Sequence, residues 1–380
     1  MSKVATAMVR IVPPLIGVAF SFIMSSVAPV HYIFAEQIIY ATLVLSTFYS
    51  SSIRQRIIKF QSFHLTASDV LILIVAALVS AFLAAIEVVS IPFLMTLIMA
   101  FIWRIQFVFL AAFFIQKGYL FTAALFQYSP ILLFQIVFFA YFIIISPEEA
   151  AQASFVYILG VICLATLVMF TVIIRPIWRA SSETIYGNVS VRLSVLLHQS
   201  GKRADVLLFS LLPNEISIPY LLSKRIFGVC DIIADYFRLL AERTIAAKAF
   251  MSFDHRQRRR SLLNFRYGVG LSCLISSALV FLYLSWVGSA HLSWYIPLLS
   301  AEFLGLTIFG PIGMVMNYHN LAHVRFWYML FSQGAKIGLL FALVALHPEY
   351  KYILASTFLV IEISTMYALD KVVKFAAAKG

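Results

Sequence analysis

Charged side chains interrupt the apolar runs of this sequence at several places. The stretch SGKRADVLLFSLLPNEISIPYLLSKR, residues 200–225, contains Lys202, Arg203, Asp205, Lys224 and Arg225 among its leucines and isoleucines. Single charges stand in four further apolar runs, namely Arg104 in MAFIWRIQFVF, Glu302 in LLSAEFLGL, Lys336 in SQGAKIGLL and Glu362 in FLVIEIST. Bases in a partly dehydrated setting suit an anionic head group, because arginine in particular matches phosphate oxygens with two parallel hydrogen bonds.

The spacing of the polar residues between positions 194 and 242 places them on helix faces. At intervals of three or four residues come Lys224, Gly228, Asp231, Asp235, Arg238 and Glu242, and upstream of them Ser194, His198, Lys202 and Asp205. A charge at the centre of a membrane helix costs roughly 2.5–3.5 kcal/mol on insertion scales, so neither face is expected to meet lipid. The two faces therefore predict a helical hairpin that lines one water-filled cavity.

The bases and acids of this set receive different predicted roles. The bases are expected to bind the anionic part of a substrate, and they are Arg104, Lys202, Arg203, Lys224, Arg225 and Lys336. The acids are candidates for coupling transport to a proton or a sodium ion, and they are Asp205, Asp231, Glu302 and Glu362. Bases outnumber acids, which predicts a cationic cavity.

The charges of the hairpin also have a structural interpretation. Lys202 and Asp205 lie three residues apart and can neutralise each other within one helix. Arg225 is one residue away from the Lys224 face and can reach the outer surface by snorkelling. Substrate contact and local neutralisation therefore both stay open for this stretch.

The isolated charges have structural alternatives as well. Arg104 can line the cavity or pair with an acid on another helix, such as Asp231 or Glu302. Glu302 and Glu362 can couple an ion or serve as the partner of Lys336. Glycines near these charges are expected to be helix-packing positions, and they are Gly305, Gly310, Gly313, Gly334 and Gly338.

The composition around these charges is that of an integral membrane protein. The chain has 380 residues, of which 62% are hydrophobic and 12% are charged, and its mean hydropathy is +0.96. Its apolar runs lack the alternation of membrane strands, so they predict helices, which satisfy every backbone group within the bilayer. The three cysteines stand inside apolar runs without paired spacing. We expect no catalytic residue, no metal and no cofactor.

Apolar runs of about 17–25 residues predict membrane-spanning helices. Twelve such runs cover residues 10–27, 35–51, 68–86, 92–115, 119–145, 151–174, 193–212, 217–237, 267–287, 294–315, 326–346 and 352–371. The first two helices of each half turn at a proline and lead into a basic amphipathic connector. The sequence therefore predicts an all-α membrane protein with two six-helix lobes, residues 1–185 and 186–380.

Lysine and arginine alternate with acids across the predicted loops, and this alternation fixes the expected orientation. The acidic loops contain Glu36, Glu87, Glu148, Glu149, Glu215 and Glu349, whereas nearly all bases fall on the other side. By the positive-inside rule both termini are predicted to be cytoplasmic. The net charge of +12 then follows from topology, and DHRQRRR, residues 254–260, is expected to contact anionic membrane lipids and not nucleic acid.

The whole chain resembles the bacterial polysaccharide flippase (Wzx-type) branch of the multidrug, oligosaccharidyl-lipid and polysaccharide exporter superfamily. The segments that carry the resemblance are KRADVLLFSLLPNEISIPYLLSKRIFGVCDIIADYF, GPIGMVMNYHNLAHVRFW and EYKYILASTFLVIEISTMYALDKVVKF. The resemblance implies two lobes in a V that alternate between inward-open and outward-open states. It also implies that a polyprenyl-pyrophosphate-linked oligosaccharide crosses the bacterial inner membrane, with basic cavity residues on the pyrophosphate and polysaccharide polymerase or assembly proteins as partners.

Two other functions compete with this interpretation. A drug or small-cation exporter of the same fold would need a net acidic cavity. A membrane-embedded glycosyl or acyl transferase would need an acidic or histidine site at the membrane surface, and the candidates His319 and His323 are expected to be solvated residues of a short cytoplasmic link. We therefore expect a transporter and not an enzyme.

Overall fold

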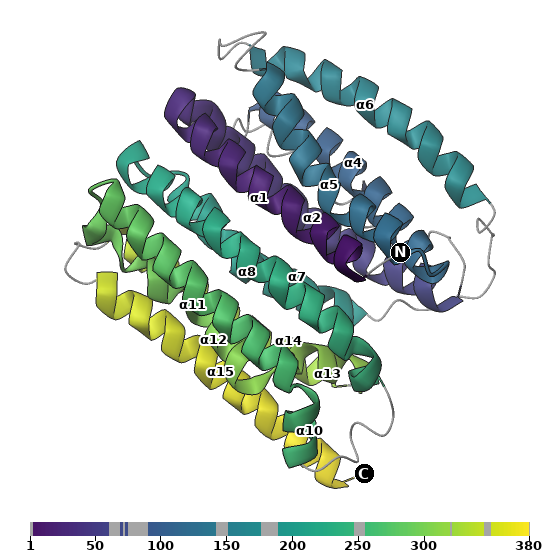
Figure 1. Ribbon diagram of the computed structural model, residues 1–380, viewed down its shortest axis with the longest axis vertical. Coiled ribbons are helices and arrows are strands. Elements are labelled where there is room, and N and C mark those ends of the chain that lie inside the picture. Colours follow the sequence, from purple (N-terminus) through teal and green to yellow (C-terminus); the bar gives the residue numbers. More distant parts are fainter. Residues whose placement is uncertain are drawn as a thin grey trace. The chain divides into compact units, whose positions relative to one another are not determined.

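The computed structural model describes residues 3–60, 69–70, 73–74, 90–141, 151–175, 189–246, 255–319, 321–345 and 351–379. These ranges are helical and contain no β-strand, as Figure 1 shows, so the all-α prediction is confirmed for this part of the chain. The chain divides into two compact units, Met1–Leu196 and Leu197–Gly380. The boundary predicted between positions 185 and 186 lies outside the described residues.

The first unit is a helical bundle centred on one apolar helix. Its described helices are α1 (Lys3–Val27), α2 (Pro29–Phe60), α4 (Ile91–Gln116), α5 (Leu120–Phe139) and α6 (Ala151–Ile174). Helix α4 packs against α2, α5 and α6, and it is apolar on nearly every face, which is typical of a helix enclosed by its neighbours. Its core contacts include Phe109 and Leu110 of α4, Tyr49 and Ile53 of α2 and Phe170 of α6.

Helix α5 is bent at a proline. The segments Phe121–Gln127 and Leu132–Phe138 meet at 42°, and Pro130 between them removes one backbone donor from the helix. Arg104 of α4 donates from Nη1 to the carbonyl of Gln127 at 2.8 Å, in the turn that precedes this proline. The arginine thus satisfies backbone polarity next to the bend.

The second unit contains the predicted polar hairpin, which α7 (Val189–Phe209) and α8 (Asn214–Ala246) form. Its described helices are the part of α7 from Leu197 onward, α8, α10 (His255–Ser261), α11 (Leu263–Trp286), η3 (Ala290–Leu292), α12 (Tyr295–Phe309), α13 (Ile312–Tyr318), α14 (Ala322–Ala345) and α15 (Lys351–Lys379). Helix α11 packs against α8 and α12, and α15 packs against α12 and α14. The buried rings of Phe209 and Tyr220 stack at 4.1 Å where α7 turns into α8, and Tyr295 donates to the carbonyl of Ile216 at 3.0 Å.

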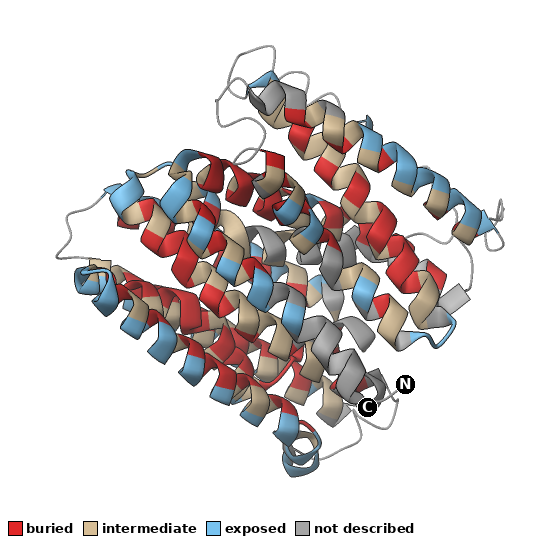
Figure 2. Cartoon of the chain, turned by 45° about the horizontal axis from the view of Figure 1, so that its top comes forward, coloured by how far each residue is buried: buried red, intermediate tan, exposed pale blue. Residues whose placement is uncertain are grey.

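Several described helices are long and apolar enough to cross a membrane. Six of them pass by length and composition, at Pro29–Ser50, Ile91–Ile115, Leu263–Trp286, Ala290–Phe309, His323–Leu343 and Lys351–Ala377. Each overlaps one of the predicted spans. The predicted spans 193–212 and 217–237 are described but are not among these six, and the predicted span 68–86 lies largely outside the described residues. Outward faces are apolar: Leu274 is 69% exposed, Phe331 74% and Trp286 82%, and Figure 2 shows such exposed strips along the outer helices. The protein is therefore membrane-embedded.

The prediction of a single helix over residues 294–315 is wrong. Helix α12 ends at Phe309 because Gly310 adopts φ +81° and ψ −169°, a backbone conformation that essentially only glycine populates, and α13 follows from Ile312. Gly310 therefore ends a helix, and its prediction as a helix-packing position is wrong. Gly305 is a packing position, since a Cβ there would lie 3.2 Å from Cγ of Met366 on α15.

We predict that Gly310→Ala destabilises the protein by about 1–3 kcal/mol, because alanine would hold this conformation under strain. Gly334→Ala is the matched control, since Gly334 is helical and a Cβ there meets no described atom within 4 Å. The control should be neutral or slightly stabilising. Thermal unfolding in detergent measures both, and equal melting temperatures for the two variants would refute the role given to Gly310.

Candidate functional site

A lysine between two carboxylates joins three helices of the second unit. Lys202 of α7 pairs with Asp231 of α8, and its ammonium lies 3.2 Å from the carboxylate of Glu302 on α12. The ring of Phe303 lies below the same ammonium, 5.5 Å from ring centroid to Nζ. The side chain of Lys202 is only 12% exposed, and a buried ammonium requires such neutralising partners.

Glu302 is the centre of this arrangement. Besides Lys202, its Oε1 faces Nε2 of His198 and Nη2 of Arg238, each at 3.7 Å. Three basic side chains from α7 and α8 thus converge on one carboxylate of an otherwise apolar helix. We call His198, Lys202, Asp231, Arg238 and Glu302 the Glu302 cluster. Asp235 and Glu242, which share the predicted face of α8, have side chains outside the described set.

A second ion pair closes the same hairpin nearer its turn. Lys224 of α8 lies 2.7 Å from Oδ2 of Asp205 and donates to the backbone carbonyl of Lys202 at 3.0 Å. Tyr220 donates to the same carboxylate, and the other oxygen of Asp205 accepts from the amide of Val206 at 2.8 Å. The intrahelical neutralisation of Lys202 by Asp205 is therefore not the observed arrangement. Both residues have their partners on α8, Lys202 in Asp231 and Asp205 in Lys224.

A third pair joins α14 to α15. Lys336 pairs with Glu362, and each side chain is only 6% exposed. The ring of Phe358 lies 5.3 Å from Nζ of Lys336. Of the two acids considered as partners of Lys336, Glu362 is thus the one in direct contact, while Glu302 belongs to the cluster described above.

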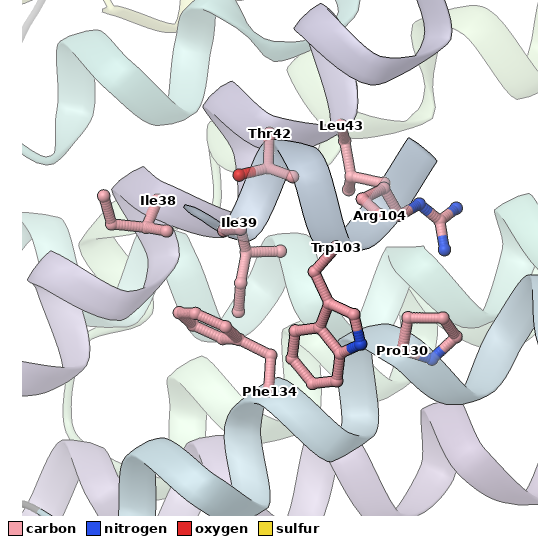
Figure 3. A pocket seen from close by; sticks show the side chains of 9 residues that line it. Ile38, Ile39, Thr42, Leu43, Trp103, Arg104, Pro130 and Phe134 are labelled. Atoms are coloured by element: carbon pink, nitrogen blue, oxygen red, sulfur yellow. The ribbon is translucent and has the colours of Figure 1, made fainter. Parts of the chain in front are cut away.

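The predicted site arginines lie in different surroundings. Arg203 and Arg225 are half-buried and follow Lys202 and Lys224 by one position, about 100° further around each helix. Arg104 belongs to the first unit and lines a cavity of about 20 Å³ with Trp103 and Phe134. Figure 3 shows its guanidinium pointing away from these two rings. The cavity has room for about one water molecule and is too small for a phosphate group.

Sequence reasoning missed or misjudged several residues of the second unit. His198 and Arg238 were placed on the polar faces but given no role, although both contact Glu302. Arg325, which directly precedes the predicted span 326–346, is 6% exposed and donates to the carbonyl of Gly313 at 3.3 Å. His319 was expected to be solvated, but its Nε2 is hydrogen-bonded with the carbonyl of Ile245 at 2.9 Å, so it ties α13 to the end of α8. His323 is exposed.

The site contains neither a recognisable metal centre nor a known signature. Within the described ranges, no three His, Cys, Asp or Glu side chains are grouped so that they could hold a metal ion, and the three cysteines are free and buried. No known protein family, curated protein or solved structure matches the chain. The fold and the site define a polytopic α-helical membrane protein with ion pairs buried between its helices.

We predict that the pair Lys336–Glu362 shows strong coupling in a double-mutant cycle. Lys336→Met or Glu362→Met alone should cost about 3–5 kcal/mol, because each leaves an uncompensated buried charge, whereas the double variant should recover most of that loss. Unfolding by denaturant in detergent micelles gives the free energies.

The less buried pair Lys374–Asp370 is the control for this cycle. Its atoms lie 2.5 Å apart, but the Lys374 side chain is 34% exposed, so Lys374→Met should cost less than about 1 kcal/mol. Additive losses for Lys336→Met and Glu362→Met would show that the buried pair is not coupled.

Proposed function

We propose that this protein is a transporter of an anionic, lipid-linked substrate and that the Glu302 cluster is its binding and coupling site. The observation that supports this proposal is the convergence of His198, Lys202 and Arg238 on one buried carboxylate. Ionisable residues inside membrane helices are costly, and they are candidates for substrate and ion pathways by default. A carboxylate surrounded by bases is suited to exchanging its partners.

The chemistry of the cluster follows from competition for the same bases. While Glu302 is ionised, it holds Lys202 and Arg238 by charge-assisted contacts. Protonation of Glu302 removes its negative charge, so Arg238 loses this contact and Lys202 keeps only its pair with Asp231; a pyrophosphate oxygen can then take the place of Glu302. Binding of a proton and binding of the anion therefore favour each other, which is the coupling a proton-driven transporter requires.

The specific function that we propose is that of a flippase for a polyprenyl-pyrophosphate-linked oligosaccharide, such as an O-antigen, capsule or exopolysaccharide unit. Its support is the resemblance of the α7–α8 hairpin to polysaccharide flippases together with the basic residues of the hairpin. In this proposal twelve helices form two six-helix lobes in a V, and alternating access moves the substrate from the cytoplasmic to the outer leaflet of a bacterial inner membrane. Polysaccharide polymerase or assembly proteins would receive it.

The structure changes which bases we assign to the pyrophosphate. Lys224 and Lys336 each have one close carboxylate partner, so we assign them to holding helices together. Lys202 and Arg238 share Glu302 with a third base, and we assign these two to the substrate.

One observation favours a second candidate, a drug or small-cation exporter. Asp231 and Glu302 both contact the Lys202 ammonium, so a cationic substrate could take its place between the same two carboxylates. The two candidates differ in the effect of Lys202→Met. This change should abolish transport of an anion but should leave or enhance transport of a cationic dye.

Two experiments test the flippase proposal. One is genetic complementation, and the other is the pH dependence of substrate binding to the purified protein. The protein is expressed in a bacterium whose own polysaccharide flippase is deleted, and surface glycan is measured. Binding of a polyprenyl-pyrophosphate glycan to the purified protein should strengthen as pH falls. In Glu302→Gln this pH dependence should become smaller, and Lys202→Met should weaken binding about tenfold or more, because a charge-assisted hydrogen bond is lost.

Arg256→Gln is the matched control, since Arg256 is an exposed base of α10. It should restore surface glycan and bind like the parent protein. Unchanged pH dependence in Glu302→Gln would reject the coupling role, and a parent that transports a cationic dye but restores no glycan would favour the exporter.

A further inference from the structure

A cavity of about 250 Å³ lies in the second unit, and its lining shares no residue with the Glu302 cluster. Helices α10, α11, α12, α13 and α15 all contribute to its lining. Figure 1 shows the short helix α10 beside the C-terminal part of α15, where part of this lining lies. The volume is more than ten times that of the cavity at Arg104, so it can accommodate a ligand group and not only a single water molecule.

The position of the cavity along the helices corresponds to the edge of a membrane. Arg266 stands in the first turn of the candidate span Leu263–Trp286, Ile308 in the last turn of Ala290–Phe309, and Lys374 in the last turn of Lys351–Ala377. Three candidate spans thus have their ends at one cavity. This end is rich in arginine and lysine, which is the composition expected at the level of anionic lipid head groups on the cytoplasmic side.

The polar lining is net basic. The charged residues of the lining are the bases Arg258, Arg266 and Lys374 and one acid, Asp370. Asp370 lies 2.5 Å from Lys374 and neutralises it. Arg266 is anchored, because its Nε donates at 2.7 Å to the carbonyl of Thr307 in the last turn of α12. That carbonyl lacks a helical donor because the helix ends at Gly310.

Arg258 provides the observation that points to a ligand. Its Nη1 is buried and has no hydrogen-bond partner in the described part of the chain. A buried donor without an acceptor is unfavourable, and native structures normally supply a partner from protein, water or ligand. Arg258 also lines the cavity, so a phosphate oxygen there can accept a strong charge-assisted bond from its guanidinium.

The remaining lining is apolar and partly open. Ile308 is 45% exposed, and Tyr367 is exposed one to two turns from Asp370 and Lys374, toward the interior of the same span. A ligand that places a phosphate at Arg258 would therefore have an apolar surface beside it in the direction of the hydrocarbon. Such a surface suits acyl chains and not a second hydrated group.

We propose that this cavity binds one anionic phospholipid, with its phosphate on Arg258 and Arg266 and its acyl chains along Ile308 and Tyr367. The site does not depend on the identity of the transported substrate. It differs from a general attraction between a basic loop and the membrane, because Arg258 is half-buried in the lining while its neighbours Arg256 and Arg260 are exposed.

The test is binding of single lipids to the purified full-length protein in detergent, followed by native mass spectrometry. Phosphatidylglycerol should bind with higher affinity than phosphatidylcholine of the same chain length. Arg258→Gln should lower the affinity for phosphatidylglycerol at least about tenfold, whereas Arg260→Gln, which removes an exposed charge from the same short helix, should leave it within about twofold.

Two further arms identify the source of the phosphate and guard against misfolding. Soluble glycerol phosphate at the same concentration should not displace the lipid, and equal displacement would overturn the proposal in favour of a free-phosphate site. Ile308→Trp narrows the apolar side and keeps every charge, so it should weaken phosphatidylglycerol binding even if Arg258→Gln fails to fold. Equal losses in Arg258→Gln and Arg260→Gln, or no preference for phosphatidylglycerol, would also overturn it.

Discussion

An ammonium group among apolar helices must have a carboxylate nearby, and this requirement determines how the helices of the second unit are joined. In lipid, helices gain no hydrophobic free energy from meeting one another, so packing and polar contacts select the neighbours. Lys202 joins α7 to α8 and α12, Lys224 closes the α7–α8 hairpin, and Lys336 joins α14 to α15. The arrangement of these helices therefore follows the positions of three lysines.

The same requirement explains which features of the fold and of the site could be predicted from the sequence alone. Hydropathy identifies apolar helices because the backbone must be satisfied within the bilayer, and a spacing of three and four residues shows which face of a helix is polar. Both signals come from the residues of a single helix and do not say which other helices it contacts. They predicted the all-α fold in the described ranges and the polar hairpin of α7 and α8. They could not show that Glu302 would meet the hairpin while Glu362 would meet Lys336, because that choice depends on which helices become neighbours.

Two glycines and a histidine also show what could not be predicted from the sequence alone. Gly305 and Gly310 stand five positions apart in one apolar run, yet one allows close packing and the other ends the helix at φ +81°. A residue without a side chain gives the same hydropathy in both situations. His319 in a short polar link was expected in solvent, but its ring meets a carbonyl at the end of α8, a contact between segments 74 positions apart. Only the folded chain brings such segments together.

The close pairing of Lys336 with Glu362 also determines how this pair of charges responds to voltage. One elementary charge that crosses the membrane potential gains or loses about 2.3 kcal/mol per 100 mV. The lysine and the glutamate carry opposite charges in direct contact on α14 and α15, so a displacement of the two helices together moves no net charge through the field. The potential therefore does no work on this pair, and it can act only where a charge moves apart from its counterion.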